Sequence, residues 1–183
     1  MQTKIQLIKE IGKIKKVKRS GWIREGIKNP ESVADHSYRV AVMAMIFGKH
    51  LDVDVDKLIK MVLVHDLGEG SVGDIVVERG TKIDAQLRKD KEEKEIETVR
   101  QIFSKATEPD DLSRLQEESI MLESNEAKIL KQLERLEMAV QALEYEEETG
   151  KDLVEFFDNA GLHIENEYLK SLLEAVKSLR SSK

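Results

Sequence analysis

The sequence predicts an all-α fold, a single-domain helical bundle. Apolar residues recur at the three- and four-residue spacing of helices along almost the whole chain, and no stretch alternates convincingly as a strand would. The chain has only two prolines, which break helix interiors. With 183 residues, no repeat and no long linker, residues 1–183 are expected to form one domain.

The N-terminal half is expected to contain three helices separated by loops that contain glycine. The expected helices cover residues 5–15, 33–50 and 55–69, and the expected loops cover 16–34 and 70–80. Ser32 is a plausible cap for the second helix, and Asp54 or Asp56 for the third. Short polar side chains are favoured at these places because they accept the unpaired N–H groups of a first turn.

The C-terminal half is expected to be helical almost throughout. The expected helices cover residues 83–105, 109–122, 125–148, 152–159 and 165–179. Pro109 suits a first helical turn, where the missing N–H is not needed. Gly150 can adopt the left-handed backbone that ends a long helix.

Composition excludes several classes of function. The chain has a net charge of -6 and no basic stripe, so it is a poor candidate for binding polymeric nucleic acid. It has no apolar run near the ~20 residues of a membrane span and no apolar stretch at its N-terminus, so we expect a cytoplasmic protein that does not engage membranes. It also has no cysteine, which excludes thiolate metal sites and a cysteine nucleophile.

The most informative feature is His65-Asp66, which lies in the apolar run Met61–Leu67. An imidazole and a carboxylate in a buried segment are costly unless something neutralises and bonds them. A divalent metal does both. His36 lies at the start of the preceding helix, so a hairpin with its turn at 51–54 would bring His36 close to His65 and Asp66.

The alternative is that each histidine is a core residue bonded to a backbone carbonyl. Two histidines on facing helix ends, beside an aspartate, favour a metal, since no Arg or Lys lies between Met61 and Glu78 to pair with that carboxylate. Histidine and carboxylate ligands suit one divalent transition metal ion: Mn, Co, Ni, Fe or Zn.

The order of motifs resembles the HD-domain metal-dependent phosphohydrolases, in particular their 5′-deoxynucleotidase branch. The motifs that carry the resemblance are His36…His65-Asp66 and the segments 18–22, 29–37, 65–69, 72–75, 126–128 and 141–146. The resemblance implies an HD-type helical bundle with a metal-binding core at about residues 16–148 and C-terminal helices at 152–180. It also implies a homodimer that hydrolyses 2′-deoxynucleoside 5′-monophosphates, a small-molecule substrate.

The family holds its metal with two histidines and two carboxylates, which implies His36, His65 and Asp66 as three ligands here. The fourth is an aspartate in the family, and its position corresponds to Glu134. Helical periodicity places Glu137 within the apolar stripe of the same helix and Glu134 on its flank. Burial alone favours Glu137, whereas the resemblance implies Glu134. We expect Glu134 as the ligand, with Glu137 as the alternative; in a third interpretation both are surface acids.

The resemblance also assigns the remaining site residues. Glu69 and Asp74 are implied in catalysis, with Asp74 as the partner of the attacking water and Glu69 as the group that handles a proton or orients the substrate. Arg19 is implied at the phosphate, which suits the paired donors of a guanidinium. Trp22 is implied at the sugar or base. The residue types alone also allow a surface turn at Asp74, an ordinary helix end at Glu69 and a loop anchor at Trp22.

Three other functions stay open. A different HD hydrolase would act on cyclic or pyrophosphorylated nucleotides. A non-catalytic sensor or scaffold would keep the metal only for structure, an option strengthened by glutamate at position 134. A plain helical interaction module would hold no stoichiometric metal.

Overall fold

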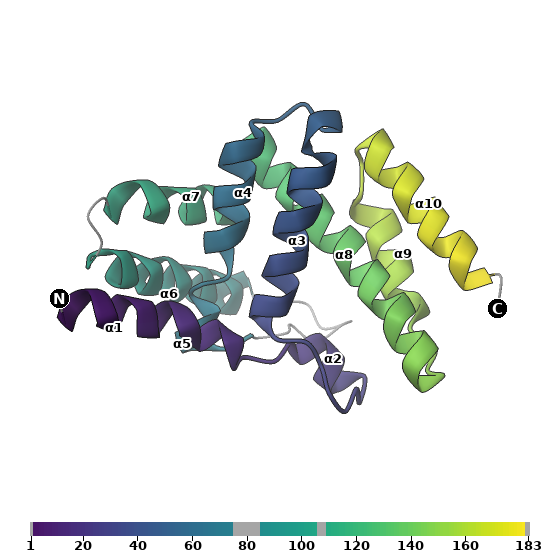
Figure 1. Cartoon of the computed structure of the whole chain (residues 1–183), viewed down its shortest axis with the longest axis horizontal. Helices are drawn as coiled ribbons and strands as arrows, with labels where there is room; N and C mark the ends of the chain where they lie inside the picture. Colours follow the sequence, from purple (N-terminus) through teal and green to yellow (C-terminus); the bar gives the residue numbers. More distant parts are fainter. Residues whose placement is uncertain (1, 75–84, 106–108, 182–183) are drawn as a thin grey trace.

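The computed structural model describes residues 2–74, 85–105 and 109–181, and within these ranges the chain forms helices without strands (Figure 1). The elements are α1 (Gln2–Ile11), η1 (Gly12–Lys15), α2 (Ser20–Arg24), α3 (Val33–Phe47), η2 (Gly48–His50), α4 (Val55–His65), α5 (Glu69–Val72), α6 (Ala85–Phe103), α7 (Pro109–Met121), α8 (Asn125–Thr149), α9 (Val154–His163) and α10 (Glu167–Ser181). The prediction of an all-α fold is therefore confirmed.

The predicted caps form where short polar side chains precede helices. Ser32 and Asp35 make a reciprocal capping box at the start of α3. Asp54, rather than Asp56, caps α4 by accepting a hydrogen bond from the backbone N–H of Lys57. Gly150 ends α8 with a φ of 70°, in the left-handed region that glycine adopts without strain.

Some predicted boundaries are wrong; the helix expected over 152–159, for example, is α9, which extends to His163. The helix expected over 55–69 ends at His65, and Glu69 begins the separate short helix α5. The segment 16–34, expected to be a loop, contains α2. Of the expected loop at 70–80, residues 75–80 lie outside the described part of the chain.

The segment that follows α4 lies very close to α6. A Cβ on Gly68 would lie 3.0 Å from the Cα of Glu95 in α6, so only glycine lets the two backbones come this near. The apolar side chains around this contact form a small second cluster made of Val64, Leu67, Val99, Ile102 and Phe103.

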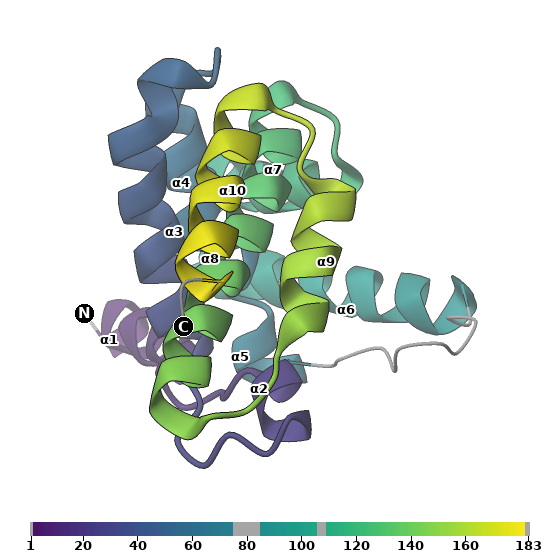
Figure 2. The ribbon, with the colours of Figure 1, turned by 90° about the vertical axis from the view of Figure 1, so that its right-hand side faces the viewer.

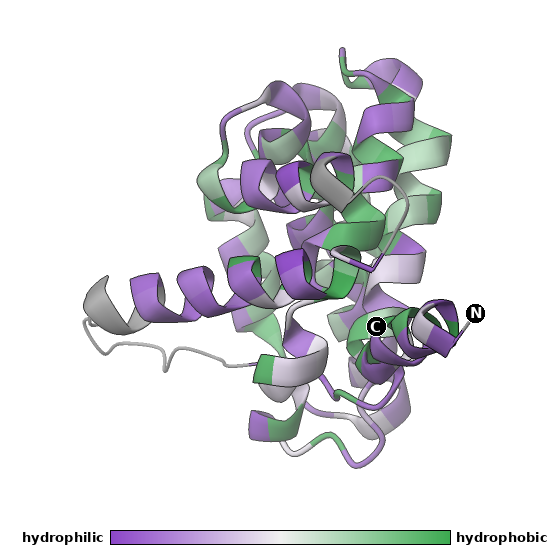
Figure 3. Ribbon diagram, turned by 90° about the vertical axis from the view of Figure 1, so that its left-hand side faces the viewer, coloured by the Kyte–Doolittle hydropathy of each residue, from purple (hydrophilic) through white to green (hydrophobic). Residues whose placement is uncertain are grey.

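The main core surrounds α8. Figures 1 and 2 show α8 between the α3–α4 hairpin and the C-terminal pair α9 and α10. Leu130, Leu133 and Leu136 of α8 are almost completely buried in it. Figure 3 shows that α6, on the other side of the hairpin, is hydrophilic along most of its length. Among the described residues, no helix combines the length and the apolar character needed to cross a membrane.

Candidate metal centre

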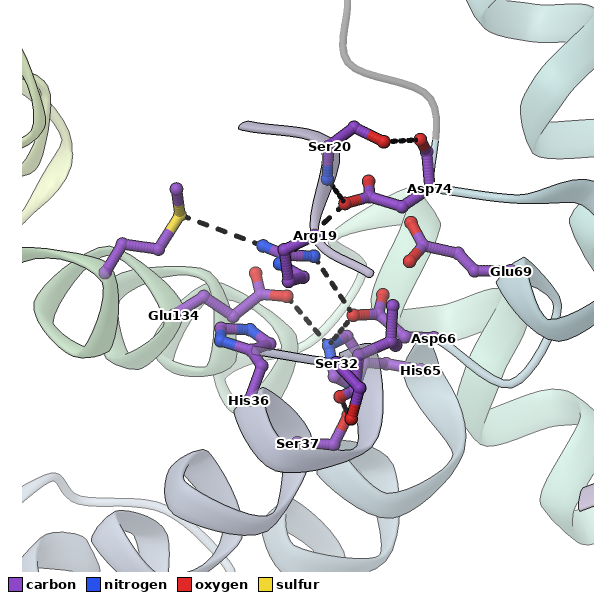
Figure 4. Close-up of polar contacts among 12 residues, drawn as sticks. Arg19, Ser20, Ser32, His36, Ser37, His65, Asp66, Glu69, Asp74 and Glu134 are labelled. Atoms are coloured by element: carbon purple, nitrogen blue, oxygen red, sulfur yellow. Dashed lines mark hydrogen bonds and ion pairs between the residues drawn. The ribbon is translucent and has the colours of Figure 1, made fainter. Parts of the chain in front are cut away.

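The hairpin brings four of the predicted site residues together. His36 lies in the first turn of α3, His65 ends α4, Asp66 follows it, and Glu134 comes from the middle of α8 (Figure 4). Each offers one ligand atom, and these atoms all lie within 4.8 Å of one another. This is the group that the sequence predicted, and two histidines with two carboxylates can together hold a divalent ion.

The hydrogen bonds of the two histidines suit a metal. Nδ1 of His65 lies 2.6 Å from the carbonyl oxygen of Val62, which can only accept, so Nδ1 carries the proton. Nδ1 of His36 lies 2.6 Å from Oε2 of Glu137. Nε2 of both rings is buried: in His36 it has no hydrogen-bond partner among the described residues, and in His65 it faces carboxylate oxygens of Asp66 and Glu134 at 3.0 and 2.9 Å. Buried polar atoms are seldom left unpaired, and the lone pairs here would be satisfied by an ion.

Charges at the centre depend strongly on one another. Burial disfavours a charged ring, but Asp66 and Glu134 outweigh it and raise the pKa of His65 to about 10. Burial works against both carboxylates too, yet the pKa of Asp66 is held below its usual value chiefly by His65, and that of Glu134 chiefly by Lys131 and then His65. The carboxylates therefore favour a positive charge at this position, and a divalent cation could supply it.

The two glutamates of α8 occupy different places. Oε1 of Glu134 lies 2.9 Å from Nε2 of His65, and its Oε2 lies 3.0 Å from Nζ of Lys131. Glu137 is completely buried, and it lies at the Nδ1 side of His36. The longer side chain of glutamate thus still reaches the centre at position 134, and Glu137 lies behind a histidine.

Arg19 is a fixed cation at this centre. Its Nη1 lies 3.7 Å from Oδ2 of Asp66 and its Nε lies 4.0 Å from Oδ2 of Asp74. Its Nη2 also contacts the sulfur of Met138, at 3.8 Å. Burial opposes the charge, but Asp66 and Asp74 outweigh it and raise the pKa of Arg19. Positive charge of this kind can bind a phosphate group.

Glu69 and Asp74 complete the centre on the side away from α8. The backbone N–H of Ser20 donates to Oδ2 of Asp74 at 2.7 Å. Glu69 is buried, and Figure 4 shows its carboxyl group pointing toward Asp66 and Asp74. Burial, together with those two carboxylates, raises the pKa of Glu69 to about 9. Glu69 therefore carries a proton at neutral pH and can act as an acid.

Trp22 differs from what the resemblance implies. Its side chain is 1% exposed, its ring stacks on Phe156 with centroids 4.2 Å apart, and its indole N–H donates to Oε1 of Glu31. Tyr145 packs edge-on against the ring. No face of the indole is free for a sugar or a base in this structure, and this packing fits a loop anchor.

Two nearby residues were missed by the sequence analysis. Lys91 of α6 lies 3.6 Å from Oε1 of Glu69, a contact created by the approach of α6 at Gly68. Glu31 lies close to His36 and Glu137, with ligand atoms within 4.8 Å. Glu31 follows Pro30 in the segment 29–37, which carries part of the family resemblance and could have indicated it. Lys91 lies among the many charged residues of 90–97, where nothing in the sequence singles it out.

Comparison with known proteins places the chain in a family. A family model described as HD domain matches residues 11–177. The human protein named 5′-deoxynucleotidase HDDC2 is 39% identical over 95% of this chain and 86% of its own, and the Dictyostelium discoideum protein of that name is 33% identical over 98% and 100%. A solved structure of a conserved hypothetical protein from Pyrococcus furiosus has a TM-score of 0.77 and 33% identity, covering 95% of this chain and 99% of that one. The chain belongs to the HD-domain family.

Proposed function

We propose that this chain is an enzyme, a metal-dependent phosphomonoesterase that hydrolyses 2′-deoxynucleoside 5′-monophosphates to a deoxynucleoside and phosphate. The observation that carries the proposal is the group of His36, His65, Asp66 and Glu134, whose candidate ligand atoms all lie within 4.8 Å of one another, with Arg19 beside it. The names of the relatives, 5′-deoxynucleotidase, support this choice of substrate class.

In this proposal, His36, His65, Asp66 and Glu134 hold one divalent transition metal ion. Their nitrogen and oxygen donors suit Mn, Co, Ni, Fe or Zn. When bound, such an ion supplies Lewis acidity, which lowers the pKa of water and polarises a phosphoryl oxygen.

The other side chains of the site bind the phosphate and transfer protons. Arg19 binds the phosphate and offsets the charge that develops on it in the transition state. Asp74 accepts a proton from the attacking water as the new O–P bond forms. Glu69, which carries a proton at neutral pH, donates it to the 5′ oxygen as the bond between that oxygen and phosphorus breaks.

Trp22 contributes indirectly, by holding α2 and the adjacent Arg19 in place. Its packing against Phe156 holds α2 in place, and Arg19 immediately precedes α2. Trp22 is in this view a positioning residue for Arg19, and contact with the sugar or base is not part of the proposal.

We further propose that the protein is a cytoplasmic homodimer. Support for the dimer comes from α3, where Tyr38, Met45 and Ile46 are 72%, 63% and 56% exposed. Large apolar side chains grouped on one helix are typical of surfaces that pack against a second chain. The mass of the purified protein in solution tests this directly: a monomer at micromolar concentration would contradict it.

A substrate panel tests the reaction. Purified protein is stripped with a chelator, reloaded with Mn²⁺ or Co²⁺, and incubated with deoxynucleoside and ribonucleoside monophosphates, triphosphates and cyclic nucleotides, and substrate loss and all products are measured by chromatography. Deoxynucleoside monophosphates should be hydrolysed fastest. Faster turnover of cyclic or pyrophosphorylated nucleotides would favour the other HD hydrolase, and stoichiometric metal without turnover of any nucleotide would favour the scaffold.

A further inference from the structure

Glu137 is a buried carboxylate that the proposed reaction does not use. It lies one turn after Glu134 on α8, and its side chain is 0% exposed. One oxygen, Oε2, lies 2.6 Å from Nδ1 of His36, and the other, Oε1, lies 3.6 Å from Nε of Arg39. The short distance to His36 is typical of a charge-assisted hydrogen bond.

This hydrogen bond determines which nitrogen of His36 can bind a metal. An ionised carboxylate only accepts, so Nδ1 must carry the proton and Nε2 must present its lone pair. Nε2 is the ring atom that is buried without a partner beside His65. His65 has the same tautomer, but its Nδ1 donates to the neutral carbonyl of Val62. The two histidines therefore differ in the charge of the group behind them.

We infer that Glu137 is a positioning residue that fixes the tautomer and orientation of His36 and makes its Nε2 a stronger metal ligand. A carboxylate that accepts from the far nitrogen of a histidine ligand raises the basicity of the ring. The inference rests on the proposed metal site, and it gives the two glutamates of α8 separate roles: Glu134 as a ligand and Glu137 behind a ligand.

Stability alone does not explain a carboxylate at this depth. Replacing a buried ion pair with apolar residues is often neutral or stabilising, because desolvation costs as much as the pair regains. Here the outer oxygen faces Arg39, whose Nη2 donates at 2.9 Å to both Gln141 and Glu144. In this arrangement Oε1 of Glu137 faces Arg39 and Oε2 is directed at Nδ1 of His36.

A second cation is the main competing explanation. The ligand atoms of Glu31, His36 and Glu137 also lie within 4.8 Å of one another. A metal there would bind Nδ1 of His36, which would then carry no proton. The two explanations therefore differ in the protonation of one nitrogen.

The first test is nitrogen-15 NMR of the full chain loaded with Zn²⁺, with histidine side chains labelled. We expect one bound Zn²⁺, a proton on Nδ1 of His36, and a resonance for that proton further downfield than the one on Nδ1 of His65. A proton on Nε2 of His36, or two bound Zn²⁺ with no proton on either nitrogen, would overturn the inference. Turnover is not needed for this readout, so a protein that binds Zn²⁺ but hydrolyses no nucleotide would refute the proposed reaction and leave this test readable.

The second test compares Glu137→Gln with Glu144→Gln. Both remove one negative charge from α8 near Arg39, but only Glu137 contacts His36. We expect Co²⁺ affinity, measured by titration of its visible absorption, to fall roughly 10–100-fold in Glu137→Gln and to stay unchanged in Glu144→Gln. Wild-type affinity in a folded Glu137→Gln protein would overturn the inference. If that variant does not fold, the NMR experiment on the unaltered chain still decides.

Discussion

The two ends of the α3–α4 hairpin differ in how their charged side chains are buried and paired. At the end that holds the turn, polar groups pair with one another or with the backbone near the surface. Asp54 caps α4, the Asn125 amide donates to the carbonyl oxygen of Asp52, and Lys57 pairs with Glu126 at 3.2 Å. Each of these contacts is complete without any further molecule.

At the other end of the hairpin, charged and polar side chains are buried and incompletely paired. His36, Asp66 and Glu69 each have a buried polar atom without a hydrogen-bond partner in the described structure. Leaving such atoms unpaired costs on the order of 1–3 kcal/mol each. The comparison teaches that the number of acids near a helix end says little about function. Buried atoms without a partner also occur at Gln116 and Glu118, so the site is distinguished by several ligand-type side chains whose atoms gather at one place.

The largest effect expected from this contrast is that of Asp66→Ala. Removing this carboxylate should abolish stoichiometric metal and lower phosphate release by about a thousandfold, because a metal contributes several kcal/mol of charge stabilisation. Metal analysis and an assay on a deoxynucleoside monophosphate measure both quantities.

Asp54→Ala is the matched control at the turn. It should cost about 1 kcal/mol of folding stability through loss of the helix cap and leave metal content unchanged. Asp66→Ala protein that kept its metal and its turnover would contradict the assignment of the site.

Arg19→Ala should have the next largest effect. Loss of a donor aimed at the transferring phosphoryl group is expected to lower kcat/KM by ~100-fold or more. Arg19→Lys should recover only part of this loss, because an ammonium lacks the paired donors of a guanidinium. Arg24, which is exposed and pairs with Glu25, provides the control: Arg24→Ala should not change kcat/KM. Equal losses in Arg19→Ala and Arg24→Ala would mean that Arg19 acts only through general charge.

The hairpin and its caps could be predicted because they depend on local physics. The periodicity of α3 and α4 shows in the sequence, and Ser32 and Asp54 act on backbone groups three residues away. The position of the turn then fixes which ends meet. For this reason, the sequence alone predicts that His36, His65 and Asp66 lie close together.

What could not be predicted depends on contacts between distant segments. The segment after α4 comes close to α6 at Gly68, and nothing near Gly68 in the sequence encodes that approach. Glu134 and Glu137 lie three residues apart, so they are neighbours on one helix face, and periodicity cannot tell which is level with His65. For Trp22, the residue type allows two environments, and only the packing of Phe156 against the ring selects one.

The two ends should also respond to pH with opposite sign. Glu69 has a folded pKa of about 9 against an unfolded value of 4.5, so the unfolded chain ionises first as pH rises. The metal-free protein should lose stability through Glu69 from about pH 4.5 to 9, and Glu69→Gln should be more stable than the wild type at pH 8 by on the order of 1–3 kcal/mol. The difference should disappear near pH 4.5.

Glu126 at the turn should behave in the reverse way. Its partial burial would raise its pKa, but hydrogen bonds from the Asp54 backbone and from Lys57 outweigh this effect and lower it. Glu126→Gln should therefore be less stable than the wild type at neutral pH, with the difference lost on acidification. Urea unfolding of Glu69→Gln from pH 4.5 to 8.5, and of Glu126→Gln from neutral pH down to about pH 3, measures this, and the same sign in both would contradict the contrast.

Gly68→Ala tests the close approach of α6 to the site. The added Cβ would lie 3.0 Å from the Cα and the Cβ of Glu95, so one backbone must shift. The expected cost is ~1–3 kcal/mol of stability, together with weaker Co²⁺ binding because Asp66 is displaced. Gly21→Ala is the control, since a Cβ there meets nothing within 4 Å. Unchanged stability in Gly68→Ala would mean that α6 moves away easily.

The smallest effect is expected at the turn, from Lys57→Gln. Lys57 pairs with Glu118 and Glu126, but its side chain is 33% exposed, and such pairs contribute at most about 1 kcal/mol. Thermal unfolding should shift by a few degrees at most, and Co²⁺ affinity and phosphate release should equal those of the wild type. The exposed Lys60, on the same helix, provides the background level for losing a positive charge. If Lys57→Gln weakened Co²⁺ binding while Lys60→Gln did not, the turn would be coupled to the metal centre along α4, and the two ends of the hairpin could no longer be treated as independent.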